Sequence, residues 1–185
     1  MKIFEKIRKN IGLYSLNRKV RSMVRDRKIN NFRTARKAGI IFSCQSEEDF
    51  QAVKDFKKYL EEKSINTSIL GFINDKKIPD HLLLRTGFNF FCLKNLDLYF
   101  RPANQYIHDF ILDNFNILFD FSLNDQFPVH YISSLSPAEY KIGRLTSRVN
   151  FDLMIDVKQN KHLDFFIEQV KHYLNLIEIR NPQKN

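Results

Sequence analysis

Short runs of apolar residues alternate along the chain with stretches in which apolar positions recur every three or four residues. The short runs are typical of strands buried on both faces, and the periodic stretches are typical of helices that bury one face. On this basis we predict six strands, over residues 40–44, 67–73, 88–93, 116–121, 140–143 and 151–157.

Helix signals separate most of these strands. Ser46 is followed three residues later by Asp49, a capping box in which a hydroxyl and a carboxylate satisfy free N–H groups, so we predict a helix to about residue 63. The clearest helix is the last, which begins near Leu163 and which Asn181-Pro182 ends. Two shorter helices are expected over residues 104–114 and 128–135.

The alternation of strands and helices determines the expected fold class. Parallel strands need crossover connections, which are usually helices packed on the faces of the sheet. We therefore predict an α/β fold, a three-layer α/β sandwich with a mainly parallel sheet of Rossmann-like or flavodoxin-like type.

The first 39 residues differ from the rest in charge. They carry 13 Lys and Arg against 2 Asp and Glu, a net charge of +11, whereas residues 40–185 carry 17 against 19. Apolar residues at Ile3, Phe4, Ile7 and Ile11 recur at helical spacing and predict one or two amphipathic helices, with a break near Gly12. We divide the chain into a basic helical arm (1–38), one α/β domain (39–180) and a tail (181–185).

Composition narrows the class of protein further. Apolar content is 43%, close to the globular norm, and 18 Phe can fill a dense core. The two cysteines, Cys44 and Cys92, lie in apolar runs and suggest no disulfide framework, which fits a reducing compartment. We find no secretory signal and no apolar run of about 18 residues, so we expect a cytoplasmic protein.

The charge of the arm suggests a polyanionic partner. Lys and Arg side chains neutralise phosphates and release counterions, which gives affinity without sequence specificity. Tyr14 and Phe32 offer rings for base stacking, and Asn30 and Asn31 add neutral hydrogen-bonding groups. We predict RNA contacts, with ribosomal RNA as the favoured partner, from Lys6, Arg8, Lys9, Arg18, Lys19, Arg21, Arg25, Arg27, Lys28, Arg33, Arg36 and Lys37.

The same arm has other interpretations. A charged helix is often no more than a solvated face, or it docks on an acidic partner. Ile3 to Ile11 would either insert into an anionic membrane, with the lysines at the headgroups, or pack on the body. The apolar face fades after Leu16 while the charge rises, and this favours nucleic acid over a membrane.

A second candidate site follows the fourth predicted strand, where open α/β sheets place ligands. Side chains able to bind a ligand or transfer a proton are close together there in the sequence. An equally simple explanation is that these residues cap the turn and the next helix. The residues of this possible ligand site are Asp120, Ser122, Asn124, Asp125 and His130.

Metal and cofactor motifs are missing from the sequence. The five histidines are scattered, and no CxxC or HxxxH spacing occurs. With five glycines there is no GxGxxG motif and no Walker loop. We expect neither a metal nor a cofactor, and the sequence favours a protein that is not an enzyme.

Four stretches resemble a family of uncharacterised proteins from Bacteroidota, the DUF6913 family: residues 35–42, 89–92, 120–128 and 151–156. The resemblance implies an α/β domain behind a basic N-terminal segment and no known activity. NILFDFS followed by YKIGR is also similar to the N-terminal half of heptosyltransferases, but those enzymes are about twice as long, so the likeness extends only to the fold.

These observations favour an RNA-binding protein that associates with a ribosomal subunit or its precursor, with ribosomal proteins as further partners. The alternatives are a small-ligand-binding protein or small enzyme that uses the turn from Asp120 to His130, and a peripheral adaptor on an anionic membrane.

Overall fold

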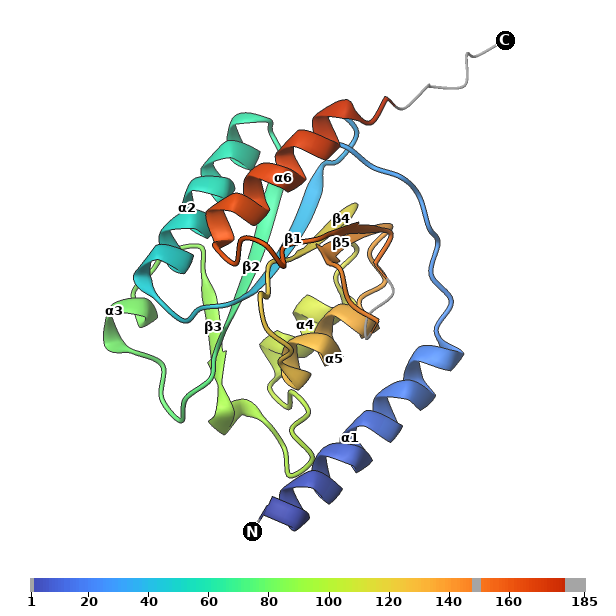
Figure 1. Ribbon diagram of the computed structural model, residues 1–185, viewed down its shortest axis with the longest axis vertical. Coiled ribbons are helices and arrows are strands. Elements are labelled where there is room, and N and C mark those ends of the chain that lie inside the picture. Colours follow the sequence, from blue (N-terminus) through green and yellow to red (C-terminus); the bar gives the residue numbers. More distant parts are fainter. Residues whose placement is uncertain (1, 148–150, 179–185) are drawn as a thin grey trace.

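The computed structural model, which describes residues 2–147 and 151–178, has a parallel sheet between two layers of helices (Figure 1). The strands pair in the order β3-β2-β1-β4-β5-β6, and every pairing is parallel. Their bounds are β1 Lys37–Ser43, β2 Asn66–Ile73, β3 Asn89–Cys92, β4 Ile117–Asp120, β5 Tyr140–Arg144 and β6 Leu153–Ile155. The predicted α/β class is confirmed.

The helices divide between the two faces of the sheet (Figure 1). Helices α2 and α6 cover one face, α4 and α5 cover the other, and α1 packs on α5. A short helix, α3, and a 3-10 turn, η1, complete the described elements, and the sequence pattern did not predict them. The bounds are α1 Lys2–Ser22, α2 Glu47–Glu62, α3 Asp80–Leu83, η1 Leu93–Asn95, α4 Gln105–Leu112, α5 Phe127–Leu135 and α6 Leu163–Leu176.

Each face of the sheet has its own apolar core. Successive residues of β4 point to opposite faces, so Phe119 joins the core under α2 and α6 while Leu118 joins the core under α4 and α5. Phenylalanine rings connect the layers: Phe56 of α2 meets Phe119 edge-on at 5.0 Å between ring centroids, and Phe121 meets Phe166 of α6 at 5.3 Å.

The start of α2 confirms the predicted capping box. The Ser46 hydroxyl accepts from the Asp49 N–H at 3.2 Å, and the Asp49 carboxylate accepts from the main-chain N–H groups of Ser46 and Gln45. This first strand-to-helix turn is where Rossmann folds bind a dinucleotide phosphate. Here the Asp49 carboxylate accepts from the main-chain N–H groups at this turn. The protein therefore has the strand order of a Rossmann fold but lacks its phosphate-binding turn.

The N-terminal segment is one continuous helix, unbroken at Gly12. This glycine lies against the body, where a Cβ atom would be 2.3 Å from the main-chain oxygen of Tyr99. Leu16, one turn further along, is buried in the core under α5. Gly12 therefore allows close packing of the helix where the sequence suggested a break.

The chain from residue 23 to 36 runs along the body without regular helix or strand beyond a turn. Phe32 and Ala35, which the sequence division places in the arm, are buried in the core under α2 and α6. Asn181-Pro182, where we expected the last helix to end, and the predicted tail lie outside the described residues; α6 ends at Leu176. None of the described helices is long and apolar enough to cross a membrane.

Candidate functional site

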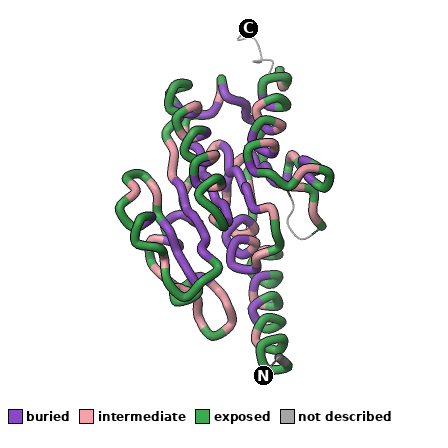
Figure 2. The backbone as a smooth tube through the Cα atoms, turned by 60° about the vertical axis from the view of Figure 1, so that its left-hand side comes forward, coloured by how far each residue is buried: buried purple, intermediate pink, exposed green. Residues whose placement is uncertain are grey.

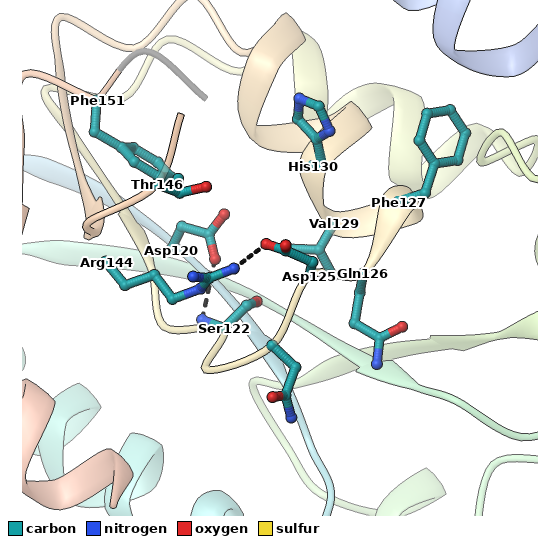
Figure 3. A pocket seen from close by; sticks show the side chains of 11 residues that line it. Asp120, Ser122, Asp125, Gln126, Phe127, Val129, His130, Arg144, Thr146 and Phe151 are labelled. Atoms are coloured by element: carbon teal, nitrogen blue, oxygen red, sulfur yellow. Dashed lines mark hydrogen bonds and ion pairs between the residues drawn. The ribbon is translucent and has the colours of Figure 1, made fainter. Parts of the chain in front are cut away.

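One region that gathers polar side chains lies at the carboxyl edge of the sheet. The strand order reverses between β1 and β4, and open α/β sheets bind ligands at such a point. A small pocket opens there beside the end of β4 (Figure 3). It is lined by Asp120, Ser122, Asn124, Asp125, Gln126, Phe127, Val129, His130, Arg144, Thr146 and Phe151.

Asp120 is the buried ionisable group of this pocket. Its carboxylate accepts from the Ser133 hydroxyl at 2.6 Å and from the Ser122 N–H at 3.0 Å. Burial raises the pKa of Asp120, while the hydrogen bonds from Ser133 and Ser122 and the nearby Arg144 charge oppose that rise. Asp120 is thus held firmly inside the fold, mainly by contacts that fix the turn after β4.

An ion pair lies in the wall of the pocket. Arg144, at the end of β5, pairs with Asp125 in the turn before α5 (Figure 3). Asn124 reaches across to Gln45, which follows β1, at 3.5 Å. The volume open to water-sized molecules is about 30 Å³. Since one water molecule needs about 10–15 Å³ of such space, the pocket has room for about two water molecules in this arrangement.

One buried hydroxyl at this edge has no hydrogen-bond partner among the described residues. It belongs to Ser43, the last residue of β1. Buried polar groups are normally paired, and an orphaned one costs about 1–3 kcal/mol. The Ser43 hydroxyl therefore leaves one polar group at the end of β1 that a small polar molecule would pair with.

The second region is a cationic cleft between α1 and α5. Its volume is about 500 Å³, much larger than that of the pocket at the sheet edge. None of the described residues that line it is acidic, and three carry basic side chains. The lining consists of Leu16, Asn17, Val20, Met23, Arg25, Arg27, His130, Ser134, Lys141 and Ser147.

A second hollow, of about 410 Å³, lies along the same turns of α1. It is lined by Tyr14, Asn17, Arg18, Arg21 and Ser22, and it shares Asn17 with the cationic cleft. The C-terminal half of α1 is therefore bordered by two hollows that carry positive charge. Tyr14 is 73% exposed beside Arg18, which leaves its ring accessible for stacking.

The outward face of the N-terminal half of α1 is apolar. Residues three, four and seven apart share a helix face, and Ile3, Ile7, Ile11 and Tyr14 follow this spacing with Phe4 beside them. Ile3 and Phe4 are 75% and 74% exposed. These residues do not pack on the body, contrary to one of our two expectations for them, and this end of the helix stands exposed (Figure 2).

Comparison with family models places the chain in a known group. A model described as a family of unknown function, DUF6913, matches residues 8–177. The chain belongs to the DUF6913 family. Comparisons with curated proteins and with solved structures found no match.

The structure separates the twelve predicted RNA-contacting residues of this DUF6913 protein into two groups. Four bind the N-terminal segment to the body, and the other eight are exposed. In the first group, Arg8 donates to the Leu98 carbonyl, Lys19 to the Tyr131 hydroxyl, Arg25 pairs with Asp152 and Lys37 with Asp113. The exposed group is Lys6, Lys9, Arg18, Arg21, Arg27, Lys28, Arg33 and Arg36.

Three further residues that the sequence suggested for RNA contact lie inside the DUF6913 fold. Phe32 is 5% exposed and packs edge-on against Tyr59, so its ring is not accessible to a base. Asn30 donates to Glu139 at 2.7 Å, and Asn31 donates to the Ile177 carbonyl at 2.8 Å. These side chains anchor the segment that leads into β1.

All five residues of the predicted ligand site line the same pocket, as their closeness in the sequence suggested. Sequence reasoning missed Arg144 of β5, which lines this pocket, Ser133 of α5, which bonds Asp120, and Lys141 of β5, which lines the cationic cleft. Lys141 carried one usable signal, because a lysine inside the short apolar run of a buried strand needs a partner. Among the described residues, no group of three or more His, Cys, Asp or Glu side chains is placed to hold a metal ion.

Proposed function

We propose that this DUF6913 protein binds RNA through the cationic surface of α1 and the segment that follows it, and that it does so on a ribosomal subunit or its precursor. The observation that carries the proposal is the pair of hollows on the C-terminal half of α1, whose lining residues combine Arg18, Arg21, Arg25 and Arg27 with the exposed ring of Tyr14. Arginine suits bidentate contact with phosphate, and aromatic rings stack on unpaired bases.

The distribution of charge supports the same proposal. Residues 1–39 carry a net charge of +11 beside a nearly neutral body, and nine of the twelve predicted basic residues are exposed. A field of one sign steers a polyanion toward the surface and holds it by counterion release. Arg8 and Lys19 fix α1 to the body, and Arg25 fixes the segment that follows it, so the body presents the cationic surface in one orientation.

The test is RNA binding by the full chain and by a charge-reversed variant. Arg18, Arg21 and Arg27 are exposed, so replacing them with Glu changes the surface without removing a buried side chain. We expect binding of a labelled single-stranded RNA, measured by fluorescence anisotropy, to weaken at least a hundredfold. The slope of log affinity against log salt should become shallower by about one for each phosphate that the variant no longer neutralises.

The matched control reverses three exposed lysines of the body, Lys54, Lys77 and Lys158, and so changes the net charge equally. We expect this control to keep most of the RNA affinity. Equal weakening in both variants, or RNA affinity unchanged in the arginine variant, would overturn the proposal. Binding of the wild-type chain to anionic liposomes without binding to RNA would move the function to a membrane surface, which the exposed Ile3 and Phe4 would suit.

A second candidate function is the binding of a small polar ligand at the sheet edge. It is favoured by the buried hydroxyl of Ser43, which has no partner among the described residues and lies at the end of β1, one of the two strands at the reversal. In this function the Arg144–Asp125 pair separates to make room for the ligand. A thermal-shift screen of small polar metabolites tests it, with Asn124→Ala as the variant. A ligand that stabilises the wild type and not the variant would support this function, and a screen without such a ligand would count against it.

A further inference from the structure

We propose that the cationic cleft between α1 and α5 is a binding site for a phosphate monoester, either the terminal phosphate of an RNA strand or that of a free nucleotide. The inference goes beyond RNA binding as such, because phosphates inside an RNA strand are diesters and carry one charge each. It depends on Arg25, Arg27 and Lys141, which line the cleft together.

Arg25 provides the first observation. Its side chain is 7% exposed, and one end of the guanidinium pairs with Asp152. Its Nε atom is buried and has no hydrogen-bond partner among the described residues. A buried guanidinium normally has its donors satisfied, and Arg25 lines the 500 Å³ cleft with one N–H still unpaired among the described residues.

Lys141 provides the second observation. It is 2% exposed, and its ammonium donates to the carbonyls of Ser133 and Ser134 at 2.8 and 3.2 Å. These carbonyls belong to the last turn of α5, where they lack helical partners. An ammonium has three donors, so one remains beyond the two used here.

The charges around the cleft are not balanced. Among the described residues, the carboxylate of Asp152 lies beside the two arginines of the cleft. It pairs with Arg25, and one of its oxygens lies 4.0 Å from the Nε atom of Arg27. Burial, together with repulsion from Arg25 and Arg27, lowers the pKa of Lys141 to about 7 against the attraction of Asp152. A bound dianion would relieve that repulsion and favour the charged ammonium.

A phosphate monoester matches this arrangement in charge, donors and size. It carries a charge of about −1.5 to −2 at pH 7 and three acceptor oxygens, which suits two guanidinium groups and one ammonium. A volume of about 500 Å³ is sufficient for the rest of a nucleotide. Asn17, Ser134 and Ser147 add neutral polar groups to the wall.

The experiment compares ligands that differ only in the phosphate group. Each nucleoside 5′-monophosphate and its nucleoside, and inorganic phosphate as the smallest probe, are titrated into the full-length protein by calorimetry at constant ionic strength. In parallel, one RNA oligomer is tested with a 5′-phosphate and with a 5′-hydroxyl group. We expect at least one monophosphate to bind ten or more times tighter than its nucleoside, or the 5′-phosphate to tighten RNA binding by a similar factor.

Two variants locate the site, and a third is the control. Arg27→Gln changes a side chain that is 66% exposed, so the protein should fold and lose at least fivefold in affinity for the monoester. Lys141→Met removes the buried ammonium and is interpreted only if its thermal unfolding remains cooperative. Lys54→Gln, an exposed lysine on α2 at the other face of the sheet, should leave the affinity unchanged.

The outcomes distinguish this inference from the proposed function. Equal affinity for RNA with and without a 5′-phosphate, together with no preference for monophosphates over nucleosides, would overturn the inference of a phosphate site. The proposal of RNA binding would be unaffected. Binding of a free monophosphate without binding of RNA would support the site and overturn the proposed function. A phosphate preference that survives Arg27→Gln and Lys141→Met unchanged would place the phosphate elsewhere and overturn the inference.

Discussion

The Ser133 hydroxyl donates a 2.6 Å hydrogen bond to the buried Asp120 carboxylate. The main-chain carbonyl of the same serine accepts a 2.8 Å hydrogen bond from the Lys141 ammonium. One residue of α5 thus contacts two buried ionisable groups, one in the pocket at the sheet edge and one in the cationic cleft. The two candidate sites are neighbours on either side of this helix, and His130 lines both.

Replacing Ser133 with Ala should destabilise the fold through Asp120. The variant leaves a buried carboxylate without its side-chain donor, at a cost of about 1–3 kcal/mol in the free energy of unfolding. Urea unfolding at pH 7 measures the loss. The control is Ser134→Ala. Ser134 is a half-buried neighbour whose main-chain carbonyl accepts from Lys141, and the substitution keeps that carbonyl. Equal stability of the two variants would show that the Asp120–Ser133 bond contributes little.

Lys141 should make stability depend on pH above neutrality. The pKa of Lys141 falls from 10.5 to about 7 in the folded chain, so between these values the unfolded chain holds the extra proton. The free energy of unfolding therefore gains a contribution that rises with pH, at a limiting slope of about 1.4 kcal/mol per pH unit. Arg25 and Arg27 increase the shift and Asp152 reduces it; His130 lines the same cleft.

The measurement is the difference in unfolding free energy between the wild type and Lys141→Met from pH 7 to pH 10. We expect it to grow in favour of the wild type as pH rises, since the variant lacks the titrating group. The pKa values of Cys44 and Tyr106, each raised to about 12, affect both proteins equally and cancel. A constant difference across this range would contradict the lowered pKa of Lys141.

The pair formed by Arg25 and Asp152 should be structural. Asp152→Asn leaves the Arg25 guanidinium buried without a counter-charge and changes the acceptor of the Lys141 main-chain N–H. Loss of one partner of a fully buried pair costs about 3–5 kcal/mol; the side chains of Arg25 and Asp152 are 7% and 14% exposed, so we expect a loss below that range. Arg27→Gln, at the exposed partner of the same carboxylate, should change stability by less than about 0.5 kcal/mol. If Arg27→Gln lowered the unfolding temperature more than Asp152→Asn, the structural role of the Arg25–Asp152 pair would be contradicted.

Gly12→Ala should loosen α1 from the body. Alanine favours an isolated helix by about 1 kcal/mol over glycine, but here its Cβ would be 2.3 Å from the Tyr99 carbonyl oxygen. We expect faster amide hydrogen exchange in α1 and faster tryptic cleavage after Arg18 and Arg21, with the sheet unaffected. Asn10→Ala, at an exposed position of the same helix, is the control. Slower exchange in Gly12→Ala would mean that helix propensity outweighs the packing.

The secondary structure was predictable because each element carries its own local signal. The six strands and the helices α2, α4, α5 and α6 follow from apolar runs, periodic stripes and the Ser46–Asp49 capping box. The short helix α3 lacks such a signal, since four residues are too few to show a period. The predicted helix break at Gly12 was wrong because glycine usually weakens a helix. Here glycine is required by the close approach of the Tyr99 main-chain oxygen, which is distant in the sequence.

The sequence by itself determined the α/β class, the basic N-terminal segment and the grouping of Asp120 to His130, because these depend on residues close together along the chain. The tertiary structure alone decided which basic side chains face solvent and which hold α1 to the body. It also brought Lys141 to the end of α5 and Arg25 to Asp152, 127 residues away in the chain. Burial and long-range pairing depend on how the layers pack, and no local pattern of residues encodes that.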